Sequence, residues 1–167
     1  LDKGGVDILQ DQLREADISN PKGYYEYKPV MSLYKDNTWL SKGQDKAVKV
    51  VAPLLKYLDS TLRYKIIFMR RDLNEIIQSK QKMIGKSEQE FPVTLYNKYQ
   101  KLLANVTLWD KSEPGVEILY VNYTDVLENP ASELARIEKF LGVAVNKQEM
   151  INCVDVSLYR NRTKAKK

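Results

Sequence analysis

The chain has 167 residues, of which 43% are hydrophobic and 29% are charged, ordinary values for one globular domain with a sizeable core. No run of about 18 apolar residues occurs, so the sequence predicts no membrane-spanning helix. The first five residues lack the basic-then-apolar layout of a signal peptide. Cys153 is the single cysteine, which excludes an internal disulfide framework and favours a reducing, cytoplasmic location.

Histidine is absent from the chain, and this restricts the available chemistry. It excludes Ser–His and Cys–His catalysis, an imidazole base and most transition-metal sites. One cysteine without histidine cannot supply the usual zinc ligands, so we expect no metal. Acid–base chemistry must therefore use a carboxylate, a lysine or a tyrosine.

The net charge of +5 is unevenly distributed. Residues 160–167 contain five basic residues and no acid, so residues 1–159 are neutral as a whole. A nucleic-acid-binding protein usually spreads basic surface over its fold, and we expect no nucleic-acid partner here. The basic segment favours either a local contact with an anion or a solvated chain end.

The first half of the chain alternates polar loops with short apolar segments. Residues 6–16 predict a short helix or turn, and the β-branched segment 47–51 predicts a strand that ends before Pro53. Leucines over 54–58 indicate a helical turn. The nearly unbroken apolar run at 64–69 is typical of a parallel strand that is covered on both faces.

The second half continues the alternation of strands and helices. Asp72 can cap a helix, and Glu75 follows it at the spacing of a capping box. Amphipathic patterns predict further helices over 87–105 and 130–141, with a strand at 117–122 between them. This order predicts an α/β fold, a three-layer sandwich with a central parallel sheet.

Arg71 and Ser79 lie where an α/β sheet commonly binds an anion, at the junction of a buried strand and the following helix. The forked guanidinium of Arg71 suits a phosphate. Ser79 follows about two helical turns later and can donate its hydroxyl to the same group. The alternative is a surface arginine in a salt bridge and a serine that faces solvent.

This strand–helix segment resembles the 3′-phosphate-binding motif of PAPS-dependent sulfotransferases (PAPS is 3′-phosphoadenosine 5′-phosphosulfate, the sulfuryl donor). Residues 121–142 are similar to the family's Tyr-Glu-Asp-Leu…Pro…Phe-Leu-Gly segment. Residues 49–55 resemble the strand that carries its catalytic Lys-Thr-His, and residues 20–26 resemble an early loop of bacterial members. The resemblance covers residues 20–163.

The resemblance implies a P-loop NTPase-like sulfotransferase fold and transfer of a sulfuryl group from PAPS to an acceptor hydroxyl or amine. It implies that Tyr123 contacts adenine and that Tyr159 and Arg160 close over the donor's 3′-phosphate. Lys49 would stabilise the bridging oxygen of the leaving phosphate. The structural alternatives are a strand-edge lysine that faces solvent and a frayed C-terminal segment.

The chain departs from the family pattern in two ways. The Gly/Ser/Thr-rich phosphosulfate-binding loop is not in this sequence, and we expect it to precede Leu1. Residues 1–167 would then form a single sulfotransferase-like domain that is incomplete at its N-terminus. Val51 stands where the family has its catalytic histidine, so the histidine-based mechanism cannot operate.

Glu26 is our candidate for the catalytic base. It follows two tyrosines in the early loop, and partial burial against them would raise its pKa toward a useful value. The alternative is a loop carboxylate paired with Lys22 or Lys28. The flanking tyrosines Tyr24, Tyr25 and Tyr27 either line an acceptor pocket or pack the loop.

Two other function classes remain open at this point. A P-loop small-molecule kinase would need a carboxylate–magnesium site, which the sequence does not reveal. A catalytically inactive nucleotide-binding or scaffold protein would not need the phosphosulfate loop. The acceptor, whether a small molecule, a glycan or a lipid, and the oligomeric state cannot be read from the sequence.

Overall fold

The structure is a computed structural model of the chain and describes residues 1–11, 13–18, 20–83 and 92–160. The described residues form strands β1 (Tyr64–Arg70) and β2 (Val116–Asn122) and helices α1 (Leu73–Met83), α2 (Val93–Ser112), α3 (Tyr123–Glu128), α4 (Pro130–Leu141) and α5 (Lys147–Asn152). Short 3₁₀ helices η1 (Asp2–Gly4), η2 (Lys28–Ser32), η3 (Thr38–Gly43), η4 (Ala52–Tyr57) and η5 (Val156–Leu158) connect them.

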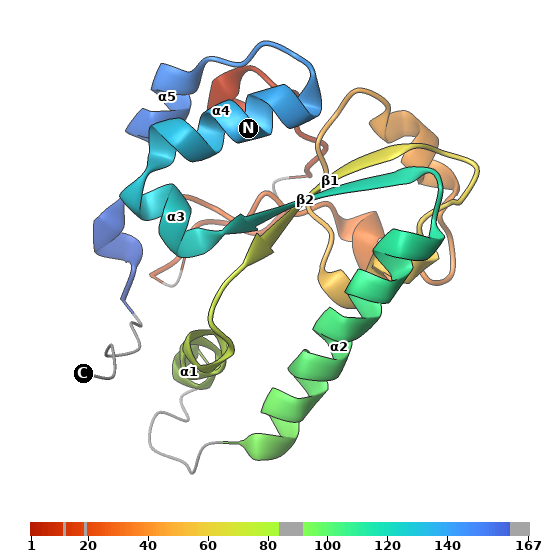
Figure 1. Cartoon of the computed structure of the whole chain (residues 1–167), viewed down its shortest axis with the longest axis horizontal. Coiled ribbons are helices and arrows are strands. Elements are labelled where there is room, and N and C mark those ends of the chain that lie inside the picture. The colour runs from red at the N-terminus through yellow and green to blue at the C-terminus, as the bar shows by residue number, and fades with distance from the viewer. Residues whose placement is uncertain (12, 19, 84–91, 161–167) are drawn as a thin grey trace.

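Strands β1 and β2 pair in parallel and lie side by side across the molecule (Figure 1). Tyr64 is opposite Val116 at one end and Arg70 is opposite Asn122 at the other. Helices α1 and α2 make the crossover between the strands, as parallel pairing requires. The strands predicted at 64–69 and 117–122 are therefore confirmed, and so is their parallel pairing.

Helices pack against the strand pair and cover it only in part: the residues of β1 are half-buried or exposed, so the expected burial of this strand on both faces is not found. Figure 1 shows α4 and α2 on opposite sides of the strands, and α5 packs on α4 and η1. The core on the α4 side contains Val121, Leu134, Ile137 and Met150, with Leu1 against it. Of these, Val121 at the end of β2 is fully buried. No helix among the described residues is long and apolar enough to cross a bilayer.

The N-terminal third builds a second core from short helices rather than from sheet. Val30, Leu33, Trp39 and Leu40 are buried together; the 3₁₀ helices carry three of them, and Leu33 directly follows η2. The ring of Trp39 contacts that of Tyr27 edge to face at 5.1 Å, a favourable aromatic geometry.

The strand predicted at 47–51 is wrong. This segment is extended but forms only one isolated parallel bridge, between Ala47 and Ile8. No described strand continues beside it, and β-branched residues make a strand only where a partner supplies the hydrogen bonds. Successive side chains nevertheless point to opposite sides, as they would in a strand. Val48 and Val50 pack on the N-terminal core, whereas Lys49 points the other way and reaches the carbonyl of Tyr24.

The other predicted elements differ in how well they agree with the structure. The helix or turn predicted at 6–16 is a loop in its described residues, because the backbone of Leu9 pairs with Ala47 instead. Helix α2 continues to Ser112 instead of ending at 105, and residues 84–91 at its predicted start lie outside the described residues. Helix α4 ends as predicted, at Gly142, whose left-handed φ of 72° favours glycine.

Candidate functional site

Arg71 and Tyr123 are brought together by the ends of the two paired strands. Each is the first residue after its strand, and the register places Arg70 opposite Asn122. Because the carboxyl ends of parallel strands meet at one edge of a sheet, this edge is where ligands commonly bind in α/β proteins. The guanidinium carbon of Arg71 lies 4.9 Å from the centre of the Tyr123 ring.

Glu75 joins this pair from the first turn of α1. Its Oε2 accepts a hydrogen bond from Nε of Arg71 at 3.0 Å, and its side chain is only 3% exposed. Its Oε1 accepts a bond of 2.6 Å from the hydroxyl of Tyr159. A buried carboxylate is tolerated only where such partners compensate its lost hydration.

Only one half of the predicted capping box forms, the half in which the Asp72 side chain accepts from backbone amides. Asp72 Oδ1 accepts hydrogen bonds from the backbone amides of Asn74 and Glu75, at 2.8 and 3.2 Å, and so begins α1 as predicted. The Glu75 side chain takes Arg71 and Tyr159 as partners. The neighbouring Arg71 cation and the distant Tyr159 phenol are stronger partners for a carboxylate than the capping amide.

Two aromatic rings flank the Arg71 guanidinium. The rings of Tyr123 and Tyr159 meet edge to face at 5.5 Å, and the guanidinium carbon lies 5.3 Å from the centre of the Tyr159 ring. Arg71, Glu75, Tyr123 and Tyr159, which we call the strand-end cluster, thus unite three predicted nucleotide-binding residues. Ser79 is half-buried two turns along α1 from Arg71. Arg160 donates from Nη1 to the carbonyl of Ile18 at 3.0 Å.

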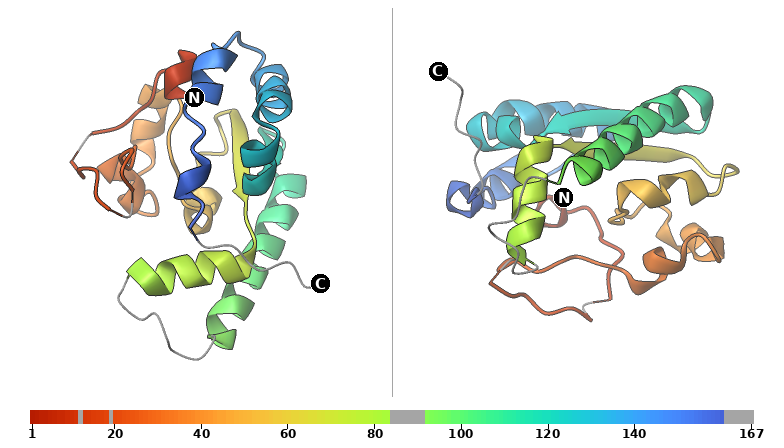
Figure 2. Two further views of the ribbon diagram at one scale, coloured as in Figure 1. Left: turned by 90° about the vertical axis from the view of Figure 1, so that its left-hand side faces the viewer. Right: turned by 90° about the horizontal axis from the view of Figure 1, so that it is seen from below.

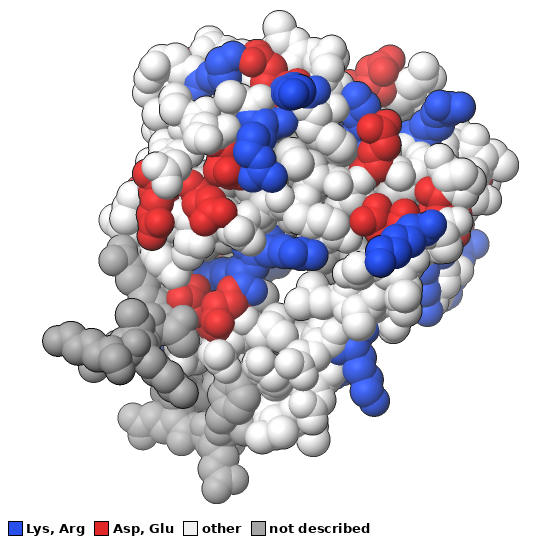
Figure 3. Space-filling view, in the orientation of Figure 1, with Lys and Arg blue, Asp and Glu red and all other residues white. Residues whose placement is uncertain are grey.

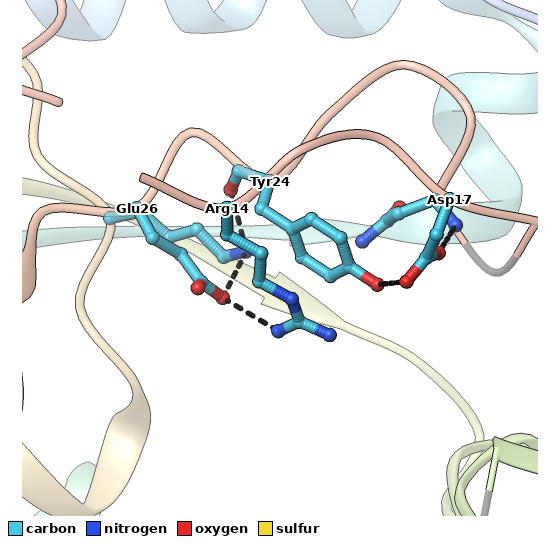
Figure 4. Close-up of polar contacts among 6 residues, drawn as sticks. Arg14, Asp17, Tyr24 and Glu26 are labelled. Atoms are coloured by element: carbon cyan, nitrogen blue, oxygen red, sulfur yellow. Dashed lines mark hydrogen bonds and ion pairs between the residues drawn. The ribbon is translucent and has the colours of Figure 1, made fainter. Parts of the chain in front are cut away.

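A second cluster forms around Glu26 and contains both predicted catalytic residues, Glu26 and Lys49 (Figure 4). The Glu26 carboxylate lies 3.6 Å from Nη1 of Arg14 and 3.7 Å from Nζ of Lys49. Lys49 also donates to the carbonyl of Tyr24 at 2.9 Å. The two predicted catalytic residues, Glu26 and Lys49, are therefore brought into contact. Glu26 thus pairs with two cations, and its side chain is 44% exposed instead of buried against the tyrosines.

Arg14 packs on the ring of Tyr24 in this second cluster. The guanidinium carbon of Arg14 lies 3.4 Å from the centre of the buried Tyr24 ring, a close cation–π contact. The Tyr24 hydroxyl donates to Oδ2 of Asp17 at 2.6 Å, and this hydrogen bond raises the pKa of the phenol above its ordinary value. Tyr24 therefore keeps its proton and acts as a donor, not as a base.

The C-terminal segment, residues 153–160, connects the strand-end cluster to the N-terminal loop. Lys22 donates to the carbonyl of Cys153 at 2.8 Å and lies 3.7 Å from the Asp155 carboxylate. Further along, Tyr159 reaches Glu75, while Arg160 reaches the loop at Ile18. Figure 2 shows this segment, in blue, descending between the N-terminal loops and the strands toward α1.

Charged side chains surround a hollow on one face of the molecule. Figure 3 shows this hollow on the visible face, with Lys and Arg side chains in it and Asp and Glu side chains beside them. No group of three or more potential metal ligands (His, Cys, Asp or Glu) occurs among the described residues.

Sequence reasoning missed Arg14 and Asp17 and misassigned Glu75. Arg14 and Asp17 lie in or beside a segment interpreted as a helix or turn, and no motif marks them. Glu75 was recognised only as a capping residue. Its position four residues after an arginine, the spacing of a helical ion pair, was an available signal. The expected pairing of Glu26 with Lys22 or Lys28 is also wrong, because Arg14 and Lys49 take that place.

Comparison with known proteins identifies the family. A model of the sulfotransferase family matches residues 55–147, more than half of the chain. The chain belongs to the sulfotransferase family. The matched region contains both strands, Arg71 to Ser79 and Tyr123, whereas Glu26, Lys49, Tyr159 and Arg160 lie outside it. No curated protein and no solved structure matches the chain.

Family membership agrees with the architecture. Sulfotransferases have a P-loop-like fold, and the structure has mixed helices and strands around a two-stranded parallel sheet. Membership also makes this sulfotransferase a group-transferring protein that acts on an acceptor.

Proposed function

We propose that this sulfotransferase moves a sulfuryl group from PAPS to a hydroxyl or amine of an acceptor. The observation that carries the proposal is the convergence of Arg71, Tyr123 and Tyr159 at the carboxyl ends of two parallel strands, in a chain of the sulfotransferase family. A guanidinium flanked by aromatic rings suits a phosphorylated adenosine, which offers an anion and a planar base together.

The strand-end cluster would hold the nucleotide end of the donor. Arg71 binds the 3′-phosphate, with the Ser79 hydroxyl as a second donor, and Tyr123 packs on the adenine. Tyr159 and Arg160 belong to a segment that already bridges α1 and the N-terminal loop, which supports their role in closing over the phosphate. A three-layer sandwich with a central parallel sheet would present this site at one edge of the sheet.

The second cluster would carry the transfer. The Glu26 carboxylate accepts the proton of the acceptor hydroxyl as the oxygen–sulfur bond forms. The bond from sulfur to the 5′-phosphate oxygen breaks, and its electron pair stays on that oxygen. Lys49 neutralises the charge that develops there, and adenosine 3′,5′-bisphosphate leaves. As in phosphoryl transfer, positioning and charge stabilisation supply most of the rate enhancement.

Calorimetric titration tests the donor assignment. Adenosine 3′,5′-bisphosphate and adenosine 5′-phosphate are titrated into wild type, Arg71→Ala and the control Arg70→Ala. Arg70 is the neighbouring arginine, which stacks on Tyr120 instead. Loss of a charge-assisted contact of about 1.5–3 kcal/mol should weaken the bisphosphate roughly tenfold to hundredfold in Arg71→Ala and largely spare the 5′-phosphate.

Two results would contradict the assignment. Equal losses for both nucleotides would show that Arg71 does not recognise the 3′-phosphate. No measurable binding of the bisphosphate by wild type would remove the donor site from this chain.

A further inference from the structure

A polar groove opens beside Glu26. It has a volume of about 440 Å³, enough for one or two sugar-sized rings. The side chains that matter for a ligand come from the N-terminal loop: Gln10, Arg14, Glu15, Lys22, Tyr25 and Glu26. Because Glu26 belongs both to this groove and to the ion pair with Lys49, a molecule in the groove lies next to the groups proposed to carry the transfer.

The loop at the groove is held in a strained shape. Gly23 and Tyr25 have left-handed φ angles of 86° and 50°, on either side of Tyr24. Glycine adopts this conformation freely, whereas a bulky residue such as Tyr25 is strained in it. The turn buries Tyr24, which is 5% exposed, and presents Tyr25, which is 37% exposed. Such strain persists at ligand-binding loops because it positions a side chain.

Arg14 is held in place at the same loop. Its guanidinium stacks on the Tyr24 ring at 3.4 Å and pairs with Glu26 at 3.6 Å (Figure 4). The backbone amide of Asp11 donates to the carbonyl of Glu26 at 3.1 Å, which ties the two sides of the loop together. A fixed planar fork of N–H donors is suited to neighbouring hydroxyl oxygens.

The lining chemistry selects among acceptors. An apolar acceptor would cover the Gln10 amide and the outward N–H groups of Arg14 without replacing their water, which disfavours its binding. An anionic acceptor would meet Asp2, Glu15 and Glu26, against only Arg14 and Lys22 among the described lining residues. Both of these cations already have acidic partners.

We infer that this groove binds the acceptor and that the acceptor is an uncharged, hydroxyl-rich molecule of the sugar class. The assignment as an acceptor site rests on the proposed function, whereas the binding of sugars does not. Hydroxyls of the ligand pair with Gln10, Arg14 and Glu15, and the exposed ring of Tyr25 packs on the C–H face of the sugar. A site built to hydrogen-bond hydroxyls discriminates strongly against ligands that lack them.

Ligand-observed saturation-transfer NMR tests this inference. The probes are the neutral disaccharides lactose, cellobiose and N,N′-diacetylchitobiose, together with glucuronic acid and 2-naphthol. At least one neutral disaccharide should bind wild type, and Tyr25→Ala and Arg14→Ala should each weaken it at least tenfold. The control Tyr34→Ala removes another exposed tyrosine, which is absent from the groove lining, and should bind as wild type does. Arg14→Lys, which keeps the charge, replaces Arg14→Ala if that variant does not fold.

The outcomes separate this inference from the proposed function. Tighter binding of 2-naphthol or glucuronic acid than of every disaccharide overturns the sugar class. So does sugar binding that survives both Tyr25→Ala and the Arg14 variant. Adenosine 3′,5′-bisphosphate is titrated into the same wild-type sample: groove-dependent sugar binding without nucleotide binding upholds the groove and refutes the donor assignment.

Discussion

Removing the Glu75 carboxylate should uncouple the C-terminal segment from the strand ends. In Glu75→Ala, Nε of Arg71 and the hydroxyl of Tyr159 each lose a charged acceptor, at 3.0 and 2.6 Å. Breaking a buried ion pair costs about 3–5 kcal/mol. Arg71 is 22% exposed, so water can partly rehydrate its guanidinium. We therefore expect a loss of about 3 kcal/mol in the free energy of unfolding.

Tyr159→Phe isolates one of the two bonds. It removes only the hydroxyl, and a hydrogen bond to a charged group contributes about 1.5–3 kcal/mol. In the Glu75→Ala background the same substitution should cost less, because this charged acceptor is already gone. The double-mutant cycle should therefore give a coupling energy of about 1.5 kcal/mol or more.

Urea unfolding followed by circular dichroism measures all four proteins of the cycle, with Tyr57→Phe as a control for loss of a tyrosine hydroxyl. Tyr57 is half-exposed and lies outside both clusters. If the two substitutions add within about 0.5 kcal/mol, the Glu75–Tyr159 bond does not hold the segment, and the reasoning fails.

Two further predictions concern the transfer and the anchoring of the C-terminal segment. If Glu26 is the base, Glu26→Gln should lower kcat by a factor of about 10²–10⁴ in a sulfuryl-transfer assay. The control Glu117→Gln, at an exposed position, should leave kcat unchanged. Near-wild-type turnover in Glu26→Gln would assign the role of base to another residue. Hydrogen bonds from Ser157, together with the charge of Lys22, lower the pKa of Asp155 below its ordinary value of 3.8. The ionised Asp155 therefore contributes its full stabilisation above pH 3.8, and this stabilisation is lost as the pH falls through the pKa of the folded state. Urea midpoints between pH 5 and 2 should fall less steeply for Asp155→Asn than for wild type, and parallel curves would contradict this.

The sequence alone determined the elements whose signals are local. The strands at 64–69 and 117–122 were predicted because a short continuous run of apolar, β-branched and aromatic residues is a local strand signal. The start of α1 at Asp72 and the end of α4 at Gly142 follow from capping chemistry, which acts over three or four residues. The proximity of Arg71 and Tyr123 follows in turn, since both strands end at one edge of the sheet.

The tertiary structure decided what depends on distant partners. Residues 47–51 carry a strand's composition, yet no neighbouring strand is present along their described length, so β propensity yields only an extended segment that aims Lys49 at Glu26. Glu75 follows the pattern of a helix cap, yet Tyr159 lies 84 residues away and takes one of its oxygens. No local pattern encodes either pairing, because the energy of a buried charge depends on whichever groups the fold packs around it.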